Sequence, residues 1–153
     1  MNLLQRMKLY YNPQRCLEKT PSGIYSGPVS AAEALLVPPG DIFTSPEAAY
    51  DIELETPCRY IHVLFGLRYR ELTEIEAVFV PIVFYAMEEI EKQWRNLVKD
   101  IREGTLKADL DIPAGTRRQL EERLFPDPKR ADELEKEFKK GHCRVEDQLL
   151  SKI

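Results

Sequence analysis

The chain has 153 residues, a length that fits one domain with a buried core. Its 43% hydrophobic and 31% charged residues are typical of a globular protein, and a net charge of -4 gives no electrostatic reason to bind nucleic acid. No apolar run approaches the ~20 residues of a membrane span. The cysteines Cys16, Cys58 and Cys143 are scattered and odd in number, which indicates reduced thiols in a cytoplasmic protein.

Prolines and glycines interrupt residues 1–40, so no long helix or strand is expected there. Residues 24–37 are expected to hold one or two short strands. The sequence Thr44-Ser45-Pro46-Glu47 then predicts the start of a short helix, with Ser45 as the N-cap and Pro46 at the first helical position.

A second helix is expected over residues 56–71, beginning at another Thr-Pro pair. Its apolar face carries Ile61, Leu64 and Phe65. Gly66 lowers the helix propensity by about 1 kcal/mol relative to alanine, so we expect a close packing contact there.

Residues 72–80 give the strongest strand prediction in the chain. By alternation, Glu76 and Val78 face one side, while Ile75 and Ala77 face the other. The end of this run is almost wholly apolar, which is typical of a central strand covered on both faces.

One long amphipathic helix is expected to follow, from Pro81 to a left-handed cap at Gly104. Apolar residues recur at steps of three and four and form one continuous stripe. The stripe consists of Val83, Met87, Ile90, Trp94, Leu97 or Val98, and Ile101. We interpret Trp94 as a core residue, because its neighbours in the stripe are apolar.

The remaining chain predicts an extended segment at residues 108–112 and two further helices. One begins at Pro113, with Leu120, Leu124 and Phe125 turned inward, and the last spans residues 129–141, with Leu134 and Phe138 turned inward. The predicted fold is α/β, with few strands packed against several helices and one long central helix.

Common catalytic signatures are missing from the sequence, including glycine-rich phosphate loops, the nucleophile elbow and the zinc-binding H-E-x-x-H motif. We therefore expect no catalytic residue and no metal ligand in this chain. Cys58 and His62 lie four residues apart and could share a helix face, but two ligands do not make a metal site. The alternative is a small buried thiol and a histidine that hydrogen-bonds a neighbouring element.

Two other polar groups have simple structural interpretations. Asp109 and Asp111 are expected to be solvated loop acids rather than a catalytic carboxylate pair. Arg68 and Arg70 could form a nucleic-acid patch, but the acidic residue Glu71 beside them favours a solvated surface.

Several segments together resemble the acyl acid amido synthetases of the auxin-responsive Gretchen Hagen three family. The most specific features are the spacing of Trp94, Asp100, Ile101, Arg102 and Gly104, and a Pro-Asp-Pro sequence downstream. The resemblance runs from about Tyr10 to Gly141 and is carried by residues 23–32, 44–53, 60–81, 94–106, 112–120 and 125–141.

The resemblance implies an adenylate-forming ligase. In such enzymes a carboxylic acid attacks the α-phosphate of ATP, which gives an acyl-adenylate and pyrophosphate. The amine of an amino acid then attacks the acyl carbon and releases AMP. The family's ATP-binding and magnesium-binding motifs have no match here, so no cofactor is expected in this chain. By this resemblance, residues 1–141 correspond to an interior fragment of the large, acyl-binding domain, and residues 142–153 form an unmatched tail.

The resemblance also implies that Glu76 and Val78 face the acyl-acid pocket. Glu76 departs from the apolar type expected beside a hydrophobic acyl chain. We expect the chain alone to be inactive, although the family joins carboxylic acids to amino acids. The alternatives are a non-catalytic interaction or structural module that self-associates through exposed apolar surface, and a nonfunctional remnant of such an enzyme.

Overall fold

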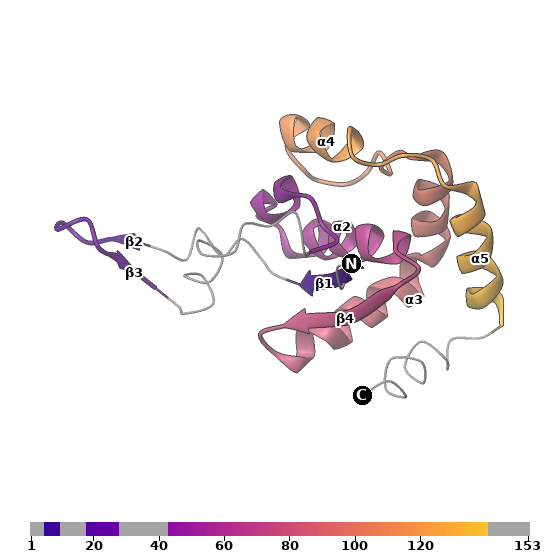
Figure 1. Ribbon diagram of the computed structural model, residues 1–153. Helices are drawn as coiled ribbons and strands as arrows, with labels where there is room; N and C mark the ends of the chain where they lie inside the picture. Colours follow the sequence, from indigo (N-terminus) through magenta and orange to yellow (C-terminus); the bar gives the residue numbers. More distant parts are fainter. Residues whose placement is uncertain (1–4, 10–17, 28–42, 141–153) are drawn as a thin grey trace.

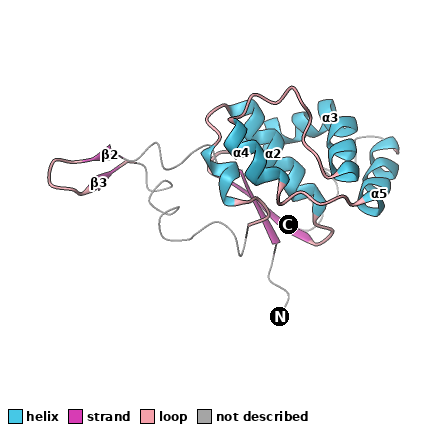
Figure 2. Ribbon diagram, turned by 90° about the horizontal axis from the view of Figure 1, so that it is seen from above, coloured by secondary structure: helices cyan, strands magenta, loops and turns pink. Residues whose placement is uncertain are grey.

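The computed structural model describes residues 5–9, 18–27 and 43–140 (Figure 1). Within them a small parallel sheet packs against a group of helices, which confirms the predicted α/β fold (Figure 2). In chain order the elements are β1 (Gln5–Leu9), β2 (Glu18–Lys19), β3 (Tyr25–Ser26), η2 (Glu47–Asp51), α2 (Glu55–Arg68), β4 (Leu72–Ala77), α3 (Val80–Glu103), α4 (Ala114–Glu121) and α5 (Pro128–Lys139).

Strands β1 and β4 pair in parallel and form the sheet that carries the core. On the face turned to the helices, Met7 and Leu9 are buried. Met7 lies against Gly66 of α2, where an added Cβ would collide with its sulfur. The close contact predicted at Gly66 is confirmed, and it explains why a glycine stands in the middle of this helix.

Strand β4 is shorter and more exposed than expected. It ends at Ala77, not at residue 80, and Thr73 and Glu74 are exposed on it. The prediction of a strand covered on both faces is wrong because one face carries charged side chains paired with β1, and the Arg6–Glu74 pair there remains partly exposed. Val80 already begins α3.

The helix predicted near Ser45 is a 3₁₀ helix that starts at Glu47, after Pro46. Ser45 does not cap it. The Ser45 Oγ atom instead lies 2.7 Å from Nδ1 of the buried His62. The capping prediction fails because a buried imidazole needs a hydrogen-bond partner, and Ser45 supplies it.

The long helix α3 confirms the predicted stripe. Trp94, Leu97 and Ile101 are buried along it, and Gly104 ends the helix with φ 67° in the left-handed region. Helix α5 packs on this stripe, with the Trp94 and Phe138 ring centroids 5.8 Å apart. Trp94 is therefore a core residue, as predicted.

The segment after α3 corrects two expectations. Residues 108–112 are not a continuous extended segment, since Ala108 and Asp109 form a turn. Leu120 and Leu124 are buried as predicted, but Phe125 is 64% exposed. The ring of Phe125 turns outward where the chain leaves α4.

The N-terminal strands fall partly outside the described residues. Of the strands expected in residues 24–37, the structure shows β3, which pairs antiparallel with β2 across a turn at Gly23. Residues 28–42 are not among those described. Among the described helices, none is long and apolar enough to cross a membrane.

Candidate functional site

An ion pair stands at the carboxyl ends of the parallel strands. Lys8 of β1 lies opposite Glu76 of β4, and its Nζ atom is 3.3 Å from Glu76 Oε1. Each residue is next to last in its strand. The lysine side chain is only 6% exposed, whereas the glutamate side chain is 30% exposed. The carboxyl edge of a parallel sheet is the usual position for a ligand in α/β folds.

Two neighbours compensate the desolvation of the buried Lys8 side chain. Glu76 supplies a negative charge, and the Phe43 ring lies under the ammonium group with its centroid 4.8 Å from Nζ. Phe43 is held there because it forms an isolated parallel β-bridge with Arg6 of β1. The pair is therefore a fixed part of the sheet and not a loose surface contact.

A second ion pair lies one repeat earlier on the same face. Arg6 Nε is 3.0 Å from Glu74 Oε2, and these side chains are 38% and 48% exposed. Alternation places Arg6 and Lys8 on one side of β1, and Glu74 and Glu76 on the matching side of β4. This face of the sheet is charged, and of its two ion pairs the one at the carboxyl end of the strands is the less exposed to solvent.

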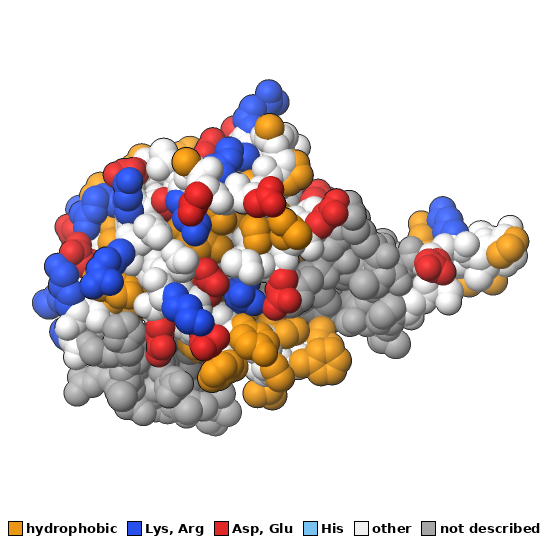
Figure 3. Space-filling model, turned by 180° about the vertical axis from the view of Figure 1, so that it is seen from behind, with side chains coloured by type: hydrophobic (Ala, Val, Ile, Leu, Met, Phe, Trp, Pro, Cys, Tyr) orange, Lys and Arg blue, Asp and Glu red, His pale blue; other side chains and the backbone are white. Residues whose placement is uncertain are grey.

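An exposed apolar cluster directly follows Glu76. Its members come from the turn after β4 and the start of α3, and their exposure ranges from 44% to 83%. Figure 3 shows apolar side chains gathered along the lower edge of the molecule, where this turn lies. The apolar cluster consists of Val78, Phe79, Val80, Phe84 and Tyr85. Adjoining exposed rings and branched side chains are typical of a surface that binds an apolar group or another protein.

A half-buried tyrosine with a buried hydroxyl group adds a further polar group within the electrostatic influence of Glu76. In the described part of the chain, the Tyr50 hydroxyl has no hydrogen-bond partner. Burial raises the pKa of Tyr50, and the negative charge of Glu76 raises it further. The hydroxyl is therefore a neutral donor within electrostatic reach of the Glu76 carboxylate.

The predicted site residues lie at this same edge. Glu76 belongs to β4 and faces Lys8, while Val78 lies just beyond the strand in the apolar cluster. Their role in binding an acyl group stays a prediction. Residue patterns alone did not single out Lys8 and Phe43. One pattern in the sequence could have indicated Lys8. Basic residues alternate in residues 5–9 and acidic residues alternate in residues 72–77, as expected for two neighbouring strands whose side chains form ion pairs.

Cys58 and His62 are structural residues, as the second interpretation predicted. The Cys58 thiol donates to Ala49 O at 3.7 Å, and burial raises its pKa to about 12. His62 is bound to Ser45. Within the described ranges, no group of three histidine, cysteine, aspartate or glutamate side chains could hold a metal ion.

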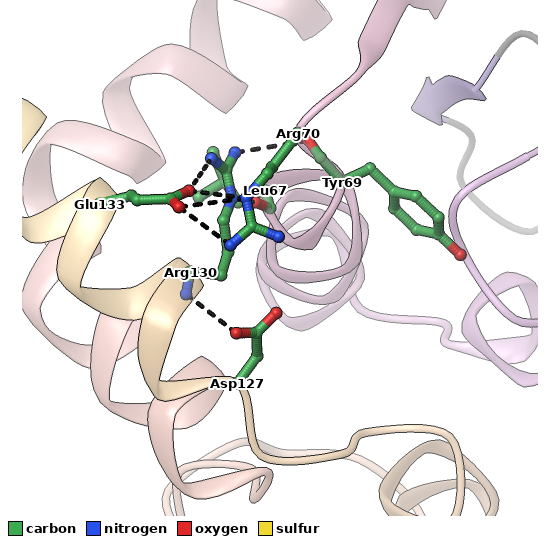
Figure 4. A network of polar contacts seen from close by, with 6 residues as sticks. All are labelled: Leu67, Tyr69, Arg70, Asp127, Arg130 and Glu133. Atoms are coloured by element: carbon green, nitrogen blue, oxygen red, sulfur yellow. Dashed lines mark hydrogen bonds and ion pairs between the residues drawn. The ribbon is translucent and has the colours of Figure 1, made fainter.

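The arginines that could have formed a nucleic-acid patch are engaged within the protein. Arg68 Nη1 donates to the carbonyl oxygen of Arg123 at 2.9 Å. Figure 4 shows Arg70 and Arg130 converging on Glu133, with Arg70 Nε 2.9 Å from Glu133 Oε2 and Arg130 Nε 2.7 Å from the carbonyl oxygen of Leu67. These bonds hold α5 against residues 67–70, which lead into β4, and so they help to fix the start of the strand that carries Glu76.

The two described glycines with positive φ, and the loop acid Asp109, have structural positions. Gly23 closes the turn between β2 and β3, and Gly104 caps α3 with Pro126 filling the space beside it. Asp109 is an exposed loop acid that lies 3.8 Å from Lys107. None of these groups forms a phosphate cradle, and we assign no step of phosphoryl transfer to them.

Comparison with known proteins identifies the family. The model of the GH3 family N-terminal domain matches residues 2–151. The chain is 32% identical over 130 residues to indole-3-acetic acid-amido synthetase GH3.6 of Arabidopsis thaliana, covering 80% of this chain and 21% of that protein. It is 34% identical over 76 residues to jasmonoyl–L-amino acid synthetase JAR4 of Nicotiana attenuata, covering 49% and 13%.

A solved structure has the same fold. The GH3.15 acyl acid amido synthetase matches with a TM-score of 0.66 at 20% identity, over 86% of this chain and 23% of that chain. The chain thus spans about a fifth of the length of the curated relative GH3.6, at 21%. The boundary expected after residue 141 stays a prediction, since residues 141–153 lie outside the described ranges. The family match over nearly the whole chain confirms the resemblance: the chain belongs to the GH3 family.

Proposed function

We propose that this chain forms one wall of the acyl-acid pocket of an ATP-dependent acid–amido synthetase. The observation that carries the proposal is the junction at the end of β4, where the Lys8–Glu76 pair meets the apolar cluster. Relatives of the chain are named for joining indole-3-acetic acid or jasmonate to amino acids. An acid of that kind has an apolar body and a polar end, which matches this mixed edge.

The residues of this chain bind and orient the acid and exclude water from it. An acyl group seated on the apolar cluster gains about 25 cal/mol per Å² of apolar surface removed from water. Pro81, in the first turn of α3, suits the start of the helix that carries Phe84 and Tyr85. Activation of the acid with ATP and magnesium belongs to other residues of the synthetase.

Nuclear magnetic resonance titration of the purified chain tests the binding role. Indole-3-acetate, jasmonate and phenylacetate are added separately, with acetate as the control that lacks an apolar body. We expect shifts of the Val78 and Val80 methyl signals with the three apolar acids and none with acetate. Unchanged signals with every acid would refute the proposal.

Pyrophosphate exchange tests whether this chain alone can activate the acid with ATP. The same chain is incubated with ATP, magnesium, labelled pyrophosphate and each acid. We expect no exchange above the rate in buffer, because no described residue forms a phosphate cradle. Exchange that depends on the acid would show that this chain alone activates its substrate.

A second candidate is an interaction module, and a specific observation favours it. Among the described strands, β4 pairs only with β1, and the exposed apolar cluster follows directly after it. A strand at the edge of a sheet pairs readily with another chain. Sedimentation over a range of concentrations would reveal self-association, and a monomer at all concentrations would count against this candidate.

A further inference from the structure

The Glu76 carboxylate at the same site indicates which class of carboxylic acid binds there. Building on the proposed function, we propose that the acid carries a hydrogen-bond donor at the end opposite its carboxylate, and that Glu76 accepts this bond. The donor is a hydroxyl, an amine or a ring N–H. The proposal names a substrate class and a specificity-determining residue.

The first argument is the geometry of the Glu76 carboxylate. Lys8 engages Oε1 from the neighbouring strand at 3.3 Å, which fixes the side chain on this face. A carboxylate has two oxygens and accepts about four hydrogen bonds. Because the side chain is 30% exposed, acceptor capacity remains for a ligand beside the apolar cluster.

The second argument is the cost of covering Glu76 with an apolar group. An acyl chain that shields the carboxylate from water without donating to it leaves part of a charged group desolvated. An acid with a donor at the same position replaces the lost water. Sites that hydrogen-bond a substrate group discriminate against analogues that lack it. Since Glu76 is partly exposed, we expect about a tenfold preference and not a larger one.

The third argument is repulsion between carboxylates. The carboxylate of the acid and that of Glu76 are both negative, so they repel at short distance. The acid therefore binds with its carboxylate away from Glu76 and its other end toward it. The apolar cluster, which begins two residues after Glu76 at Val78, contacts the body of the acid between these ends.

The buried Tyr50 hydroxyl is a further polar group that interacts electrostatically with Glu76. It has no hydrogen-bond partner in the described part of the chain, and Glu76 contributes to its raised pKa. An acid that ends in a hydroxyl group donates to Glu76 on this polar side. An acid that ends in a methyl group offers no such bond.

Matched pairs of acids test the proposal. The first pair is 4-hydroxyphenylacetate and 4-methylphenylacetate, and the second is indole-3-acetate and its 1-methyl derivative. Dissociation constants are measured by calorimetry for the full chain and for Glu76→Leu, Glu76→Gln and Glu74→Gln. Glu74 is the matched control, because it forms an equivalent ion pair on the same face, farther from the carboxyl edge.

We expect the unmodified chain to bind the donor-bearing acid of each pair about tenfold more tightly. Glu76→Leu should abolish the preference, and Glu74→Gln should preserve it. If Glu76→Leu does not fold, Glu76→Gln serves in its place and should weaken the preference, because an amide oxygen is a poorer acceptor than a carboxylate.

The outcomes separate this inference from the proposed function. If both members of each pair bind equally well to the unmodified chain, the inference is overturned while the acyl-binding role stands. A preference that survives in both Glu76 variants overturns it as well. If no acid binds, the proposed function fails, and the inference fails with it.

Discussion

The Tyr60 hydroxyl of α2 donates a hydrogen bond of 2.9 Å to Oδ2 of Asp100 in α3. The same oxygen accepts the backbone N–H of Lys107 at 2.9 Å. Both side chains are buried. Burial raises the pKa of Asp100, against the effect of the hydrogen bonds from Lys107 and Tyr60. One carboxylate therefore joins α2, α3 and the loop that follows α3.

Replacement of Asp100 tests this junction. Asp100→Ala leaves the Tyr60 hydroxyl and the Lys107 N–H buried without an acceptor, so we expect a loss of about 2–4 kcal/mol in the free energy of unfolding. Asp100→Asn keeps an acceptor and should cost far less. Urea denaturation at neutral pH measures both. Asp109→Ala, at an exposed loop acid, should change stability by less than ~0.5 kcal/mol.

The pH dependence of Asp100→Asn provides a separate test. The folded pKa of Asp100 lies above its ordinary value of 3.8, so the folded protein holds a proton that the unfolded chain releases. This contribution to stability is present below pH 3.8 and is lost as the pH rises through the folded pKa. The stability of Asp100→Asn relative to the unmodified protein should therefore increase as the pH rises through this window. A constant difference would show that Asp100 is not perturbed.

Gly66 should not tolerate a side chain. Gly66→Ala places a methyl group against the sulfur of Met7 on β1, and we expect a net loss of about 1–3 kcal/mol despite the better helix propensity of alanine. Gly115 in α4 is a matched control, because a Cβ there meets nothing within 4 Å. Thermal denaturation should show a lower midpoint for Gly66→Ala and an equal or higher midpoint for Gly115→Ala.

Ser45→Ala tests the hydrogen bond between Ser45 and His62. The substitution removes the partner of a buried His62 nitrogen and should cost about 1–3 kcal/mol. If Ser45 mainly capped the following helix, the loss would instead appear as reduced helicity at residues 47–51. Urea denaturation measures the loss of stability, and amide exchange at these residues should stay unchanged.

Trp94→Ala should cost about 3–5 kcal/mol, because the indole ring is buried between α3 and α5 and packs against Phe138. Tryptophan fluorescence is lost with this variant, so circular dichroism is the suitable measurement. An unchanged melting temperature would show that α5 does not pack on this part of α3.

Glu133 should contribute to stability at neutral pH. Its hydrogen bond to Arg70 lowers its pKa below the ordinary value of 4.5. The contribution is present above that value and is lost as the pH falls through the lower folded pKa. Glu133→Gln should destabilise the protein at pH 7 but not at the acidic end of an unfolding series. A difference that persists in acid would indicate a role other than this ion pair.

The sequence by itself determined the elements whose signals are local. The stripe of α3, its cap at Gly104 and the inward side chains of α5 follow from periodicity and from residues that suit one backbone conformation. Family membership was also readable from short segments, because it depends on residue identity and spacing. The candidate site was predicted only as Glu76 and Val78 on one strand.

Only the tertiary structure decided which distant residues meet. Lys8 faces Glu76 across the parallel pairing of two strands far apart in the chain, and Ser45 binds His62 instead of capping a helix. The strand predicted over residues 72–80 ends at Ala77, and Val78 is exposed. Local pattern does not fix these outcomes, because burial and pairing depend on neighbours brought together by folding. A buried charge or imidazole takes whichever partner the fold supplies.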